Sequence, residues 1–352
     1  MKNFFKIKCY AAVFLALLLF TAGCTWVNTE KSGAENKSEY KADGLELHFI
    51  DVGQGDCTLI KTGDTAILID SGPGSSSLKL CEYLEGAGVE KIAAFIGTHP
   101  HEDHLGGAAA VFEAFDIGEI YLTDEPSTGY FYEHMLDVLD KNNYRVTMPE
   151  FGCIYEFGGI RFQFISPKKD FGNTNDNSLV TLVTYKKARM LFMGDAEKAV
   201  EEELVKSGGD ISAGVLKVGH HGSRNASTSL FLEKVSPVCA AVQCEKGNSY
   251  GHPQKEALDR LRKCGANILR CDISGSIVIK CDGKSFSDSS GNIFKVDEKQ
   301  KEAVFYIANV KSRKYHTSSC KNLPKAENAK KFKTREEAEN AGFTPCKNCI
   351  GK

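Results

Sequence analysis

The sequence predicts an α/β fold in which two mixed β-sheets pack face to face and are covered by helices. Alternating apolar segments first come in hairpins and then alternate with helical segments up to residue 280. The chain has 352 residues, of which 42% are hydrophobic and 26% charged, and this ordinary globular usage leaves room for about two domains. Intrinsic disorder and coiled coil are therefore excluded for the chain as a whole.

The expected elements follow in chain order. The segment LELHFIDVG alternates from Leu45, and CTLIKTGDTAILID predicts a hairpin that turns at Gly63-Asp64. A helix over 75–86 then leads to a strand over 92–96. Further strands are expected at 118–122, 160–166, 178–185, 189–194, 214–218, 238–242, 267–270 and 276–280, and further helices at 106–115, 130–141, 196–207, 227–235 and 253–264.

The first 24 residues indicate export. Three lysines precede an apolar run of ten residues, Ala11 to Phe20, which has the length of a signal-peptide core and is shorter than the about 20 residues that span a bilayer. Thr21-Ala22-Gly23-Cys24 resembles a bacterial lipobox, whose cysteine carries the lipid. Thr21 stands where Leu is usual, so an ordinary cleaved signal is the alternative.

Composition divides the rest of the chain. Polar residues 25–43 predict a flexible tether, and a lipid on Cys24 would then hold the protein on the extracellular face of the cell membrane. A large domain is expected over 44–285, a linker rich in Ser, Gly and charge over 286–302, and a small module over 303–352.

A cluster of metal ligands follows the strand at 92–96. The segment THPHEDHLGG contains His99, His101, Asp103 and His104. In an extended chain His99 and His101 point the same way and can bind one ion, while Asp103 and His104 can bind a second. Imidazole and carboxylate suit Zn²⁺, with Mn²⁺ or Fe²⁺ as alternatives. A histidine-rich loop in which Asp103 only caps a helix is the bland alternative, and the full H-x-H-x-D-H spacing argues against it.

This motif resembles that of the metallo-β-lactamase superfamily, which implies a four-layer αββα sandwich with metals at one edge. The segments HFIDVGQGD, ILIDSG, NDNSLV, LFMGD and LKVGHHGS further resemble the hydrolase domain of ComEC-like competence DNA-uptake proteins. The resemblance extends over about residues 44–285 and does not include that family's long membrane-channel portion.

The resemblance implies the rest of the metal site. Asp195 corresponds to the aspartate that bridges both metals, and His252 to the last histidine ligand. The superfamily's third histidine of the first site is absent from NTNDNSLV, so the HHGS segment is expected to supply it. We expect His221 as that ligand and His220 as a proton donor or supporting group, although the order could be reversed. The expected sites are His99, His101 and His221 for one Zn²⁺, and Asp103, His104 and His252 for the other, with Asp195 shared.

Other residues are expected to assist. Asp70 resembles the aspartate that orients a ligand histidine, and Asp103 and His220 are the expected catalytic residues. Asp51, Gln54 and Asp56 are expected to hold loops near the site, with a purely structural role as the equal alternative. Contacts to an anionic substrate are expected from Ser223, Arg224 and Asn225.

The end of the chain predicts a second kind of metal site. His316 and Cys320, then Cys346 and Cys349, form two close pairs of soft ligands, which is typical of a closed structural Zn²⁺ site. The segment resembles the metal-binding module of the Ada DNA-repair protein, with His316 where that module has a cysteine. A disulfide among the cysteines is the alternative in an exported protein.

The expected function is that of an exported, metal-dependent phosphodiesterase or nuclease acting on DNA or another phosphodiester. One alternative is hydrolysis of a different bond, in a phosphocholine-type ester, a thioester or a β-lactam. A non-catalytic DNA-binding protein that aids DNA uptake is the other. Residues 291–352 carry a net charge of +7 and residues 44–290 of −11, so DNA contact is expected from the metals and the basic tail. No protein partner can be inferred.

Overall fold

The computed structural model describes residues 44–295, 306–317, 320–332 and 335–350. The predicted signal sequence with Cys24 and the predicted tether lie outside these residues. Within the described ranges no helix is long and apolar enough to cross a membrane.

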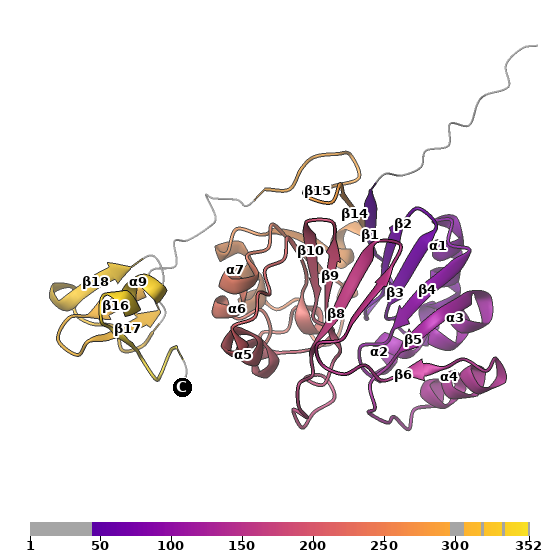
Figure 1. The fold of residues 1–352 in the computed structure, drawn as a ribbon, viewed down its shortest axis with the longest axis horizontal. Helices are drawn as coiled ribbons and strands as arrows, with labels where there is room; N and C mark the ends of the chain where they lie inside the picture. The colour runs from indigo at the N-terminus through magenta and orange to yellow at the C-terminus, as the bar shows by residue number, and fades with distance from the viewer. Residues whose placement is uncertain (1–43, 296–305, 318–319, 333–334, 351–352) are drawn as a thin grey trace, which may run out of the picture. The chain divides into compact units, whose positions relative to one another are not determined.

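The first sheet supplies one half of the large domain (Figure 1). The strands β3, β4 and β5 run parallel, so their carboxyl ends meet at the same edge, while β2 and β3 form the expected hairpin. Its eight strands lie in the order β15 (Phe286–Ser287), β14 (Ile277–Cys281), β1 (Leu45–Phe49), β2 (Thr58–Thr62), β3 (Thr65–Ile69), β4 (Lys91–Ile96), β5 (Asp116–Tyr121) and β6 (Val146–Thr147).

The second sheet supplies the other half. The strands β10, β11, β12 and β13 run parallel, and the loops after the first three of them reach the metal centre described below. Its seven strands lie in the order β13 (Asn267–Arg270), β12 (Cys239–Val242), β11 (Val215–Lys217), β10 (Ala188–Phe192), β9 (Val180–Tyr185), β8 (Ile160–Ser166) and β7 (Ile154–Phe157).

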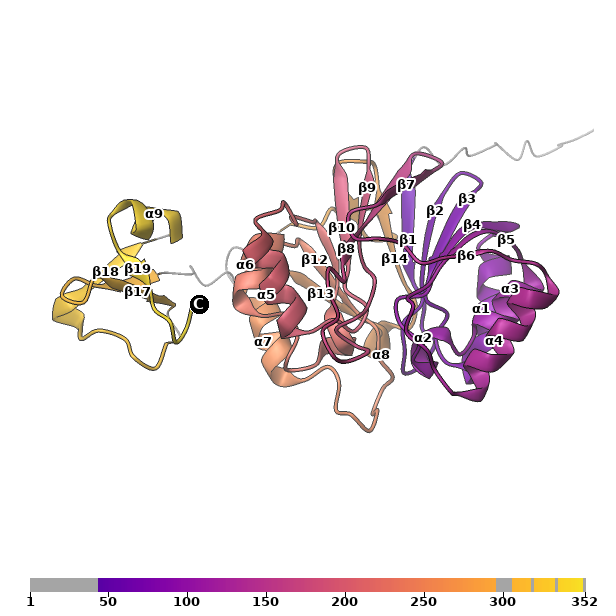
Figure 2. The same cartoon turned by 60° about the horizontal axis from the view of Figure 1, so that its bottom comes forward.

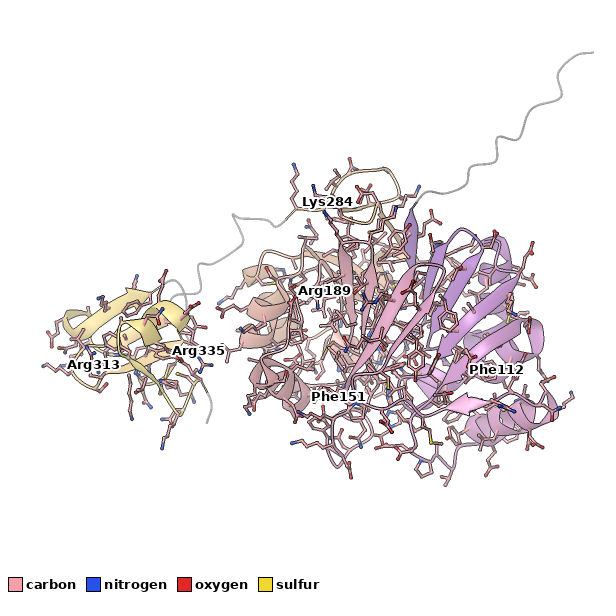
Figure 3. The ribbon with its side chains drawn as sticks, in the orientation of Figure 1. Phe112, Phe151, Arg189, Lys284, Arg313 and Arg335 are labelled. Atoms are coloured by element: carbon pink, nitrogen blue, oxygen red, sulfur yellow. The ribbon has the colours of Figure 1, made fainter. Side chains whose placement is uncertain are left out.

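Helices cover the outer face of each sheet, which confirms the four-layer αββα sandwich (Figure 2). The inner faces share one apolar core, in which the rings of Phe49 and Phe192 stack at 6.3 Å. Phe95 and Phe112 pack edge to face in the layer outside the first sheet; Phe112 is labelled in Figure 3. The covering helices are α1 (Ser77–Gly86), α3 (Ala108–Ala114) and α4 (Tyr130–Lys141) on the first sheet, and α5 (Lys198–Ser207), α6 (Ser229–Val235) and α7 (Lys255–Lys263) on the second.

The helix expected at 106–115 is divided in the structure. A short helix α2 (Glu102–Leu105) carries the ligand motif, and Gly106-Gly107 separates it from α3. A Cβ on Gly106 would lie 2.4 Å from the backbone of both Glu102 and Gly74, and one on Gly107 would lie 2.6 Å from the Ser71 carbonyl. The two glycines therefore let the ligand loop pack closely against the loop after β3.

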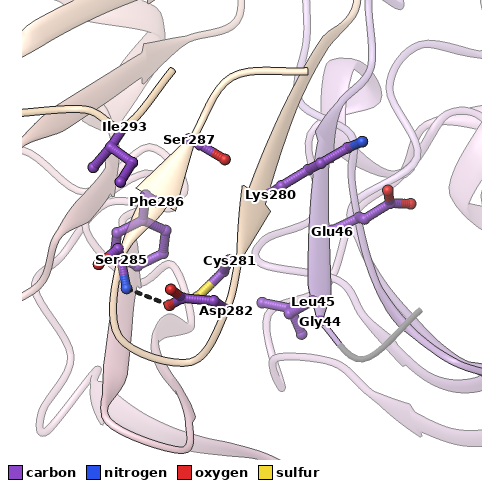
Figure 4. Close-up of a pocket in the computed structure, with 10 residues that line it drawn as sticks. All are labelled: Gly44, Leu45, Glu46, Lys280, Cys281, Asp282, Ser285, Phe286, Ser287 and Ile293. Atoms are coloured by element: carbon purple, nitrogen blue, oxygen red, sulfur yellow. Dashed lines mark hydrogen bonds between the residues drawn. The ribbon is translucent and has the colours of Figure 1, made fainter. Parts of the chain in front are cut away.

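The sheet also continues beyond the expected domain boundary at 285. Phe286 is buried in the core between the sheets, and the strand β15, which it opens, pairs with β14. A pocket of about 320 Å³ lies here between β15 and the start of β1, with Phe286 and Ile293 on one side and Leu45 on the other (Figure 4). Because β1 is parallel to β3, this pocket lies at the edge opposite to the one where β3 and β4 end.

The C-terminal module has a small four-stranded sheet of its own. A cluster of seven buried apolar residues, including Tyr306 and Tyr315, forms its core. The Arg313 guanidinium lies 4.6 Å from the centre of the Phe343 ring, and Arg335 pairs with Glu339 at 2.8 Å; both arginines are labelled in Figure 3. The elements are β16 (Tyr306–Asn309), β17 (Lys314–Thr317), β18 (Ala329–Phe332), α9 (Arg335–Asn340) and β19 (Thr344–Pro345).

Candidate metal centre

The expected ligands converge on one edge of the sandwich. His99 follows β4, Asp195 follows β10, and the His220-His221 pair follows β11. The parallel strands β10 and β11 end at one edge of the second sheet. The end of β4 in the first sheet faces this edge, since His99 Nε2 lies 3.8 Å from Asp195 Oδ2. His99, His104, Asp195 and His221 are all buried.

The first ligand group contains Asp103, His104, Asp195 and His221. Asp195 Oδ1 lies 3.3 Å from His104 Nε2 and 3.5 Å from His221 Nε2. Asp103 Oδ2 lies 3.2 Å from the same His221 nitrogen. The structure therefore places His221 with Asp103 and His104, and not, as expected from the sequence, with His99 and His101.

The second ligand group contains His99, His101 and Asp195. Nε2 of His99 lies 2.9 Å from Nδ1 of His101 and 3.8 Å from Asp195 Oδ2. Asp195 thus presents one carboxylate oxygen to each group. This is the arrangement expected of a bridging aspartate.

The donor set of this site fits divalent cations. Among the described residues, His104 Nε2 and Asp195 Oδ1 are buried atoms with no hydrogen-bond partner, and a buried polar atom without a partner is costly. Burial lowers the pKa of His221, but Asp195 and Asp56 outweigh it and raise that pKa to about 10. Burial and His104 hold the pKa of His99 well below its ordinary value, so this imidazole is neutral, as a metal ligand must be. Bound cations would neutralise the surplus carboxylate charge and would be ligated by these lone-pair atoms that have no hydrogen-bond partner.

The HHGS segment adopts a strained conformation. His220 and His221 both lie in the left-handed region, with φ of 45° and 51°, which non-glycine residues rarely adopt. A Cβ on Gly222, where φ is 86°, would lie 2.6 Å from the Pro253 side chain. Backbone strain of this kind collects at functional sites, and here it turns two adjacent histidines toward the same centre.

Comparison with known proteins decides the family. Residues 50–244 match the model of the metallo-beta-lactamase superfamily. The chain belongs to the metallo-β-lactamase superfamily. Competence protein ComA of Neisseria gonorrhoeae is 32% identical over 231 residues, which are 64% of this chain and 31% of that protein. ComE operon protein 3 of Bacillus subtilis is 28% identical over 255 residues, which are 66% of this chain and 32% of that protein. The chain thus spans about a third of the length of these relatives.

Two further comparisons concern the fold and the C-terminal module. The metallo-beta-lactamase fold protein YhfI of Bacillus subtilis is 13% identical and covers 68% of this chain and 99% of its own, with a TM-score of 0.49. Residues 292–350 match the metal binding domain of Ada. The resemblances drawn from the two sets of motifs are confirmed.

In this metallo-β-lactamase fold, Asp70 holds His104 in place. Its Oδ2 accepts a hydrogen bond from His104 Nδ1 at 2.9 Å, and its two oxygens accept from the backbone N–H and the hydroxyl of Thr98, each at 2.8 Å. With Nδ1 donating, Nε2 of His104 is left as the lone-pair nitrogen that faces Asp195. Asp70 therefore fixes both the tautomer and the orientation of a candidate ligand.

We expect Asp70→Asn to weaken metal binding in the hydrolase site by about 10–100-fold. The amide has only one acceptor oxygen, so its NH2 group would face either the Thr98 N–H or His104 Nδ1, both of which are donors. Competition of the purified protein against a chelator measures this affinity. Asp64→Asn, in the exposed turn between β2 and β3, is the matched control and keeps the wild-type affinity. Equal metal affinity of D70N and wild type would contradict a positioning role for Asp70.

A buried ion pair between Asp56 and Lys217 supports His221, and only Asp56 was expected near the site. Asp56 Oδ1 lies 3.1 Å from His221 Nδ1, and its other oxygen pairs with Lys217, which is 2% exposed. The Gln243 carbonyl lies 3.0 Å from the same His221 nitrogen. A lysine within the apolar strand β11 was the available signal, since lysine is almost never fully buried unless it is paired.

His220 has a different partner. Glu197 Oε1 accepts a hydrogen bond from His220 Nδ1 at 2.8 Å and one from the Ser223 hydroxyl at 2.6 Å. This leaves His220 Nε2 at 3.6 Å from Asp195 Oδ2. Glu197 was not predicted, although it lies two residues after Asp195.

The structure does not bring His252 into either ligand group. Its ring centre lies 5.3 Å from that of His220 and 6.2 Å from that of His221, and its Nδ1 is buried without a hydrogen-bond partner. Burial, His220 and His221 lower the pKa of His252 to about 4. His252 therefore lies beside His220 and His221, outside both ligand groups.

The C-terminal module holds the predicted zinc-binding group. His316, Cys320, Cys346 and Cys349 bring one ligand atom each to within 4.8 Å of one another. His316 Nδ1 lies 3.3 Å from Cys320 Sγ and 3.9 Å from Cys349 Sγ. Cys320, Cys346 and Cys349 form no disulfide, so the geometry favours a four-ligand site over the disulfide alternative.

Proposed function

We propose that the protein is an exported phosphodiesterase that uses two Zn²⁺ ions, with Mn²⁺ as the alternative, to hydrolyse DNA or another phosphodiester. A lipid on Cys24 would hold it at the extracellular face of the cell membrane. The observation that carries the proposal is the position of Asp195, whose two oxygens face two separate ligand groups. Similarity to a relative named as a competence protein, ComA of Neisseria gonorrhoeae, supports the proposal.

The chain offers a complete set of ligands for two ions. His99 and His101 with Asp195 Oδ2 would hold one, and Asp103, His104 and His221 with Asp195 Oδ1 would hold the other. When bound, two such ions lower the pKa of a water molecule and offset the charge that develops on a phosphoryl group.

Asp103 and His220 are the proposed catalytic residues. The Asp103 side chain is 30% exposed, whereas that of Asp195 is 3% exposed, so Asp103 is the carboxylate of this group that solvent reaches. Burial opposes charge on His220, but the hydrogen bond to Glu197 and the charge of Asp195 outweigh it and raise its pKa. A protonated His220 can donate its proton to the leaving oxygen.

Positive groups near the site suit an anionic substrate. Arg224 is exposed, and its backbone N–H and Nε both donate to Gln254 Oε1, at 2.7 and 3.0 Å. These bonds hold the Arg224 guanidinium beside Gln254, directly after the HHGS segment in the sequence. The basic C-terminal module adds charge that favours nucleic acid.

An assay with two substrates tests the proposed function. The chain from Lys41 onward, supplied with Zn²⁺ or Mn²⁺, is expected to hydrolyse both bis(p-nitrophenyl) phosphate and plasmid DNA, and D103A is expected to hydrolyse neither. Turnover of the small diester alone would support metal-dependent phosphodiester hydrolysis and would indicate that the natural substrate is a phosphodiester smaller than DNA. If metal-loaded protein turns over neither compound, the phosphodiesterase proposal is wrong, and esters, thioesters and β-lactams become the substrates to assay.

A further inference from the structure

An exposed aromatic ring lies beside the metal centre. Tyr250 is 65% exposed, and its ring stacks on that of His252 with centroids 5.8 Å apart and planes 22° from parallel. The His252 ring in turn lies 5.3 Å from that of His220. One side chain thus separates the face of Tyr250 from a proposed catalytic residue, and neither the proposed mechanism nor the fold uses this face.

The loop that carries Tyr250 is built to hold it in place. The Asn248 side-chain oxygen accepts hydrogen bonds from the backbone N–H groups of Tyr250 and His252, at 3.2 and 3.0 Å. Its side-chain amide donates to the carbonyls of Glu245 and His252, at 2.8 and 2.6 Å. A large apolar ring kept in solvent by such a network gains nothing for the core, which favours a role in binding.

The same loop is linked to a guanidinium. The Gln254 side chain donates to the Tyr250 carbonyl at 3.5 Å and accepts from the guanidinium Nε of Arg224 at 3.0 Å. An aromatic face and an arginine held by one glutamine can take the two parts of a nucleotide, because bases stack on aromatic rings and phosphates pair with guanidinium groups.

We propose that Tyr250 and Arg224 form a nucleotide subsite, in which Tyr250 stacks on the base next to the phosphate that is cleaved. This inference rests on the proposed phosphodiesterase function and deepens it. A base can stack on Tyr250 only when it has left its own stack, so the preferred substrate has unpaired bases at the cleavage site. Single strands and frayed ends fit the subsite, and the interior of an intact duplex does not.

Binding of a nuclease-resistant oligonucleotide tests the subsite. The full-length protein is titrated into a fluorescent single-stranded phosphorothioate 12-mer, and into a series in which one base at a time is replaced by an abasic residue. Wild type is expected to bind the complete strand about tenfold more tightly than the strand that lacks the stacked base. Y250A is expected to bind the complete strand about tenfold more weakly than wild type and to lose nothing further at that abasic position.

Three variants complete the test. Y250F and Y250W keep an aromatic face and should retain the discrimination between complete and abasic strands. Tyr130→Ala is the matched control, since Tyr130 is 81% exposed and stacks on His134 at 6.0 Å on α4, outside the metal centre. Unfolding midpoint and metal content are measured on each protein.

The outcomes separate the two proposals. If wild type cleaves the unmodified strand of the same sequence and binds the phosphorothioate strand, but no abasic position weakens binding or Y250A discriminates as wild type does, the subsite is wrong and the phosphodiesterase function stands. If wild type neither binds the phosphorothioate strand nor cleaves its unmodified counterpart, the proposed function on DNA fails and the subsite fails with it. Should Y250A not fold, the abasic series with wild type and Y250W still decides.

Discussion

Asp195→Asn is expected to reduce phosphodiester hydrolysis by at least about 10³-fold, which corresponds to about 4 kcal/mol of transition-state stabilisation. Asp195 is 2% exposed and is the residue shared by both ligand groups. An amide has one oxygen and no charge, so it cannot serve both groups. The substitution should therefore remove metal from the whole site.

The variant keeps the shape of the side chain, so a large loss would reflect ligand chemistry. Steady-state hydrolysis of bis(p-nitrophenyl) phosphate at saturating metal measures the effect. Asp116→Asn, at an exposed aspartate that pairs with Lys91 at 2.9 Å, is the control and should retain wild-type turnover. Retention of more than about a tenth of the wild-type rate by D195N would contradict a shared-ligand role.

Cys346→Ser is expected to unfold the C-terminal module and to leave the hydrolase domain folded. The buried core of the module consists of seven apolar residues, and a core of that size rarely stabilises a chain of about 50 residues alone. Structural zinc contributes about 10–16 kcal/mol in comparable small modules. Loss of one of the four ligands should therefore remove most of its stability.

Hydrogen exchange followed by mass spectrometry on the full chain measures this. Amides of β16 and β17 should lose protection in C346S, and also in wild type treated with a chelator, while those of β4 and β10 stay protected in C346S. Cys153→Ser is the control, because Cys153 is half-buried and belongs to neither metal site. Unchanged protection of β16 and β17 in both C346S and chelator-treated wild type would show that the module does not depend on zinc.

Residue spacing predicted the parts of the site that lie close together in sequence. His99, His101, Asp103 and His104 fall within six residues, and strand periodicity separates them into two pairs. The expected positions of the major strands and helices agree with the structure for the same reason, since apolar periodicity is local. Short strands such as β6 and β15 carry too few residues to show a period.

Features that depend on the path of the folded backbone could not be predicted from local spacing. The ligand group to which His221 belongs depends on the left-handed backbone of His220 and His221. Nothing in the sequence of the HHGS segment indicates that conformation. The pairing of Asp56 with Lys217 joins residues 161 positions apart. Tyr250 carries no motif, and only the stack on His252 shows where its exposed face lies.

The most direct test of a two-metal phosphodiesterase is metal content measured together with the initial rate in the same samples. The chain from Lys41 onward is dialysed against graded free Zn²⁺ or Mn²⁺, and bound metal per chain and phosphodiester turnover are determined at each point. We predict three ions per wild-type chain, two in the Asp195 site and one in the C-terminal module, with turnover rising as the Asp195 pair fills. D195N should hold only the ion of the module and show no turnover. A wild-type chain that holds only the module's ion, or a D195N chain that turns over at the wild-type rate, would contradict the account.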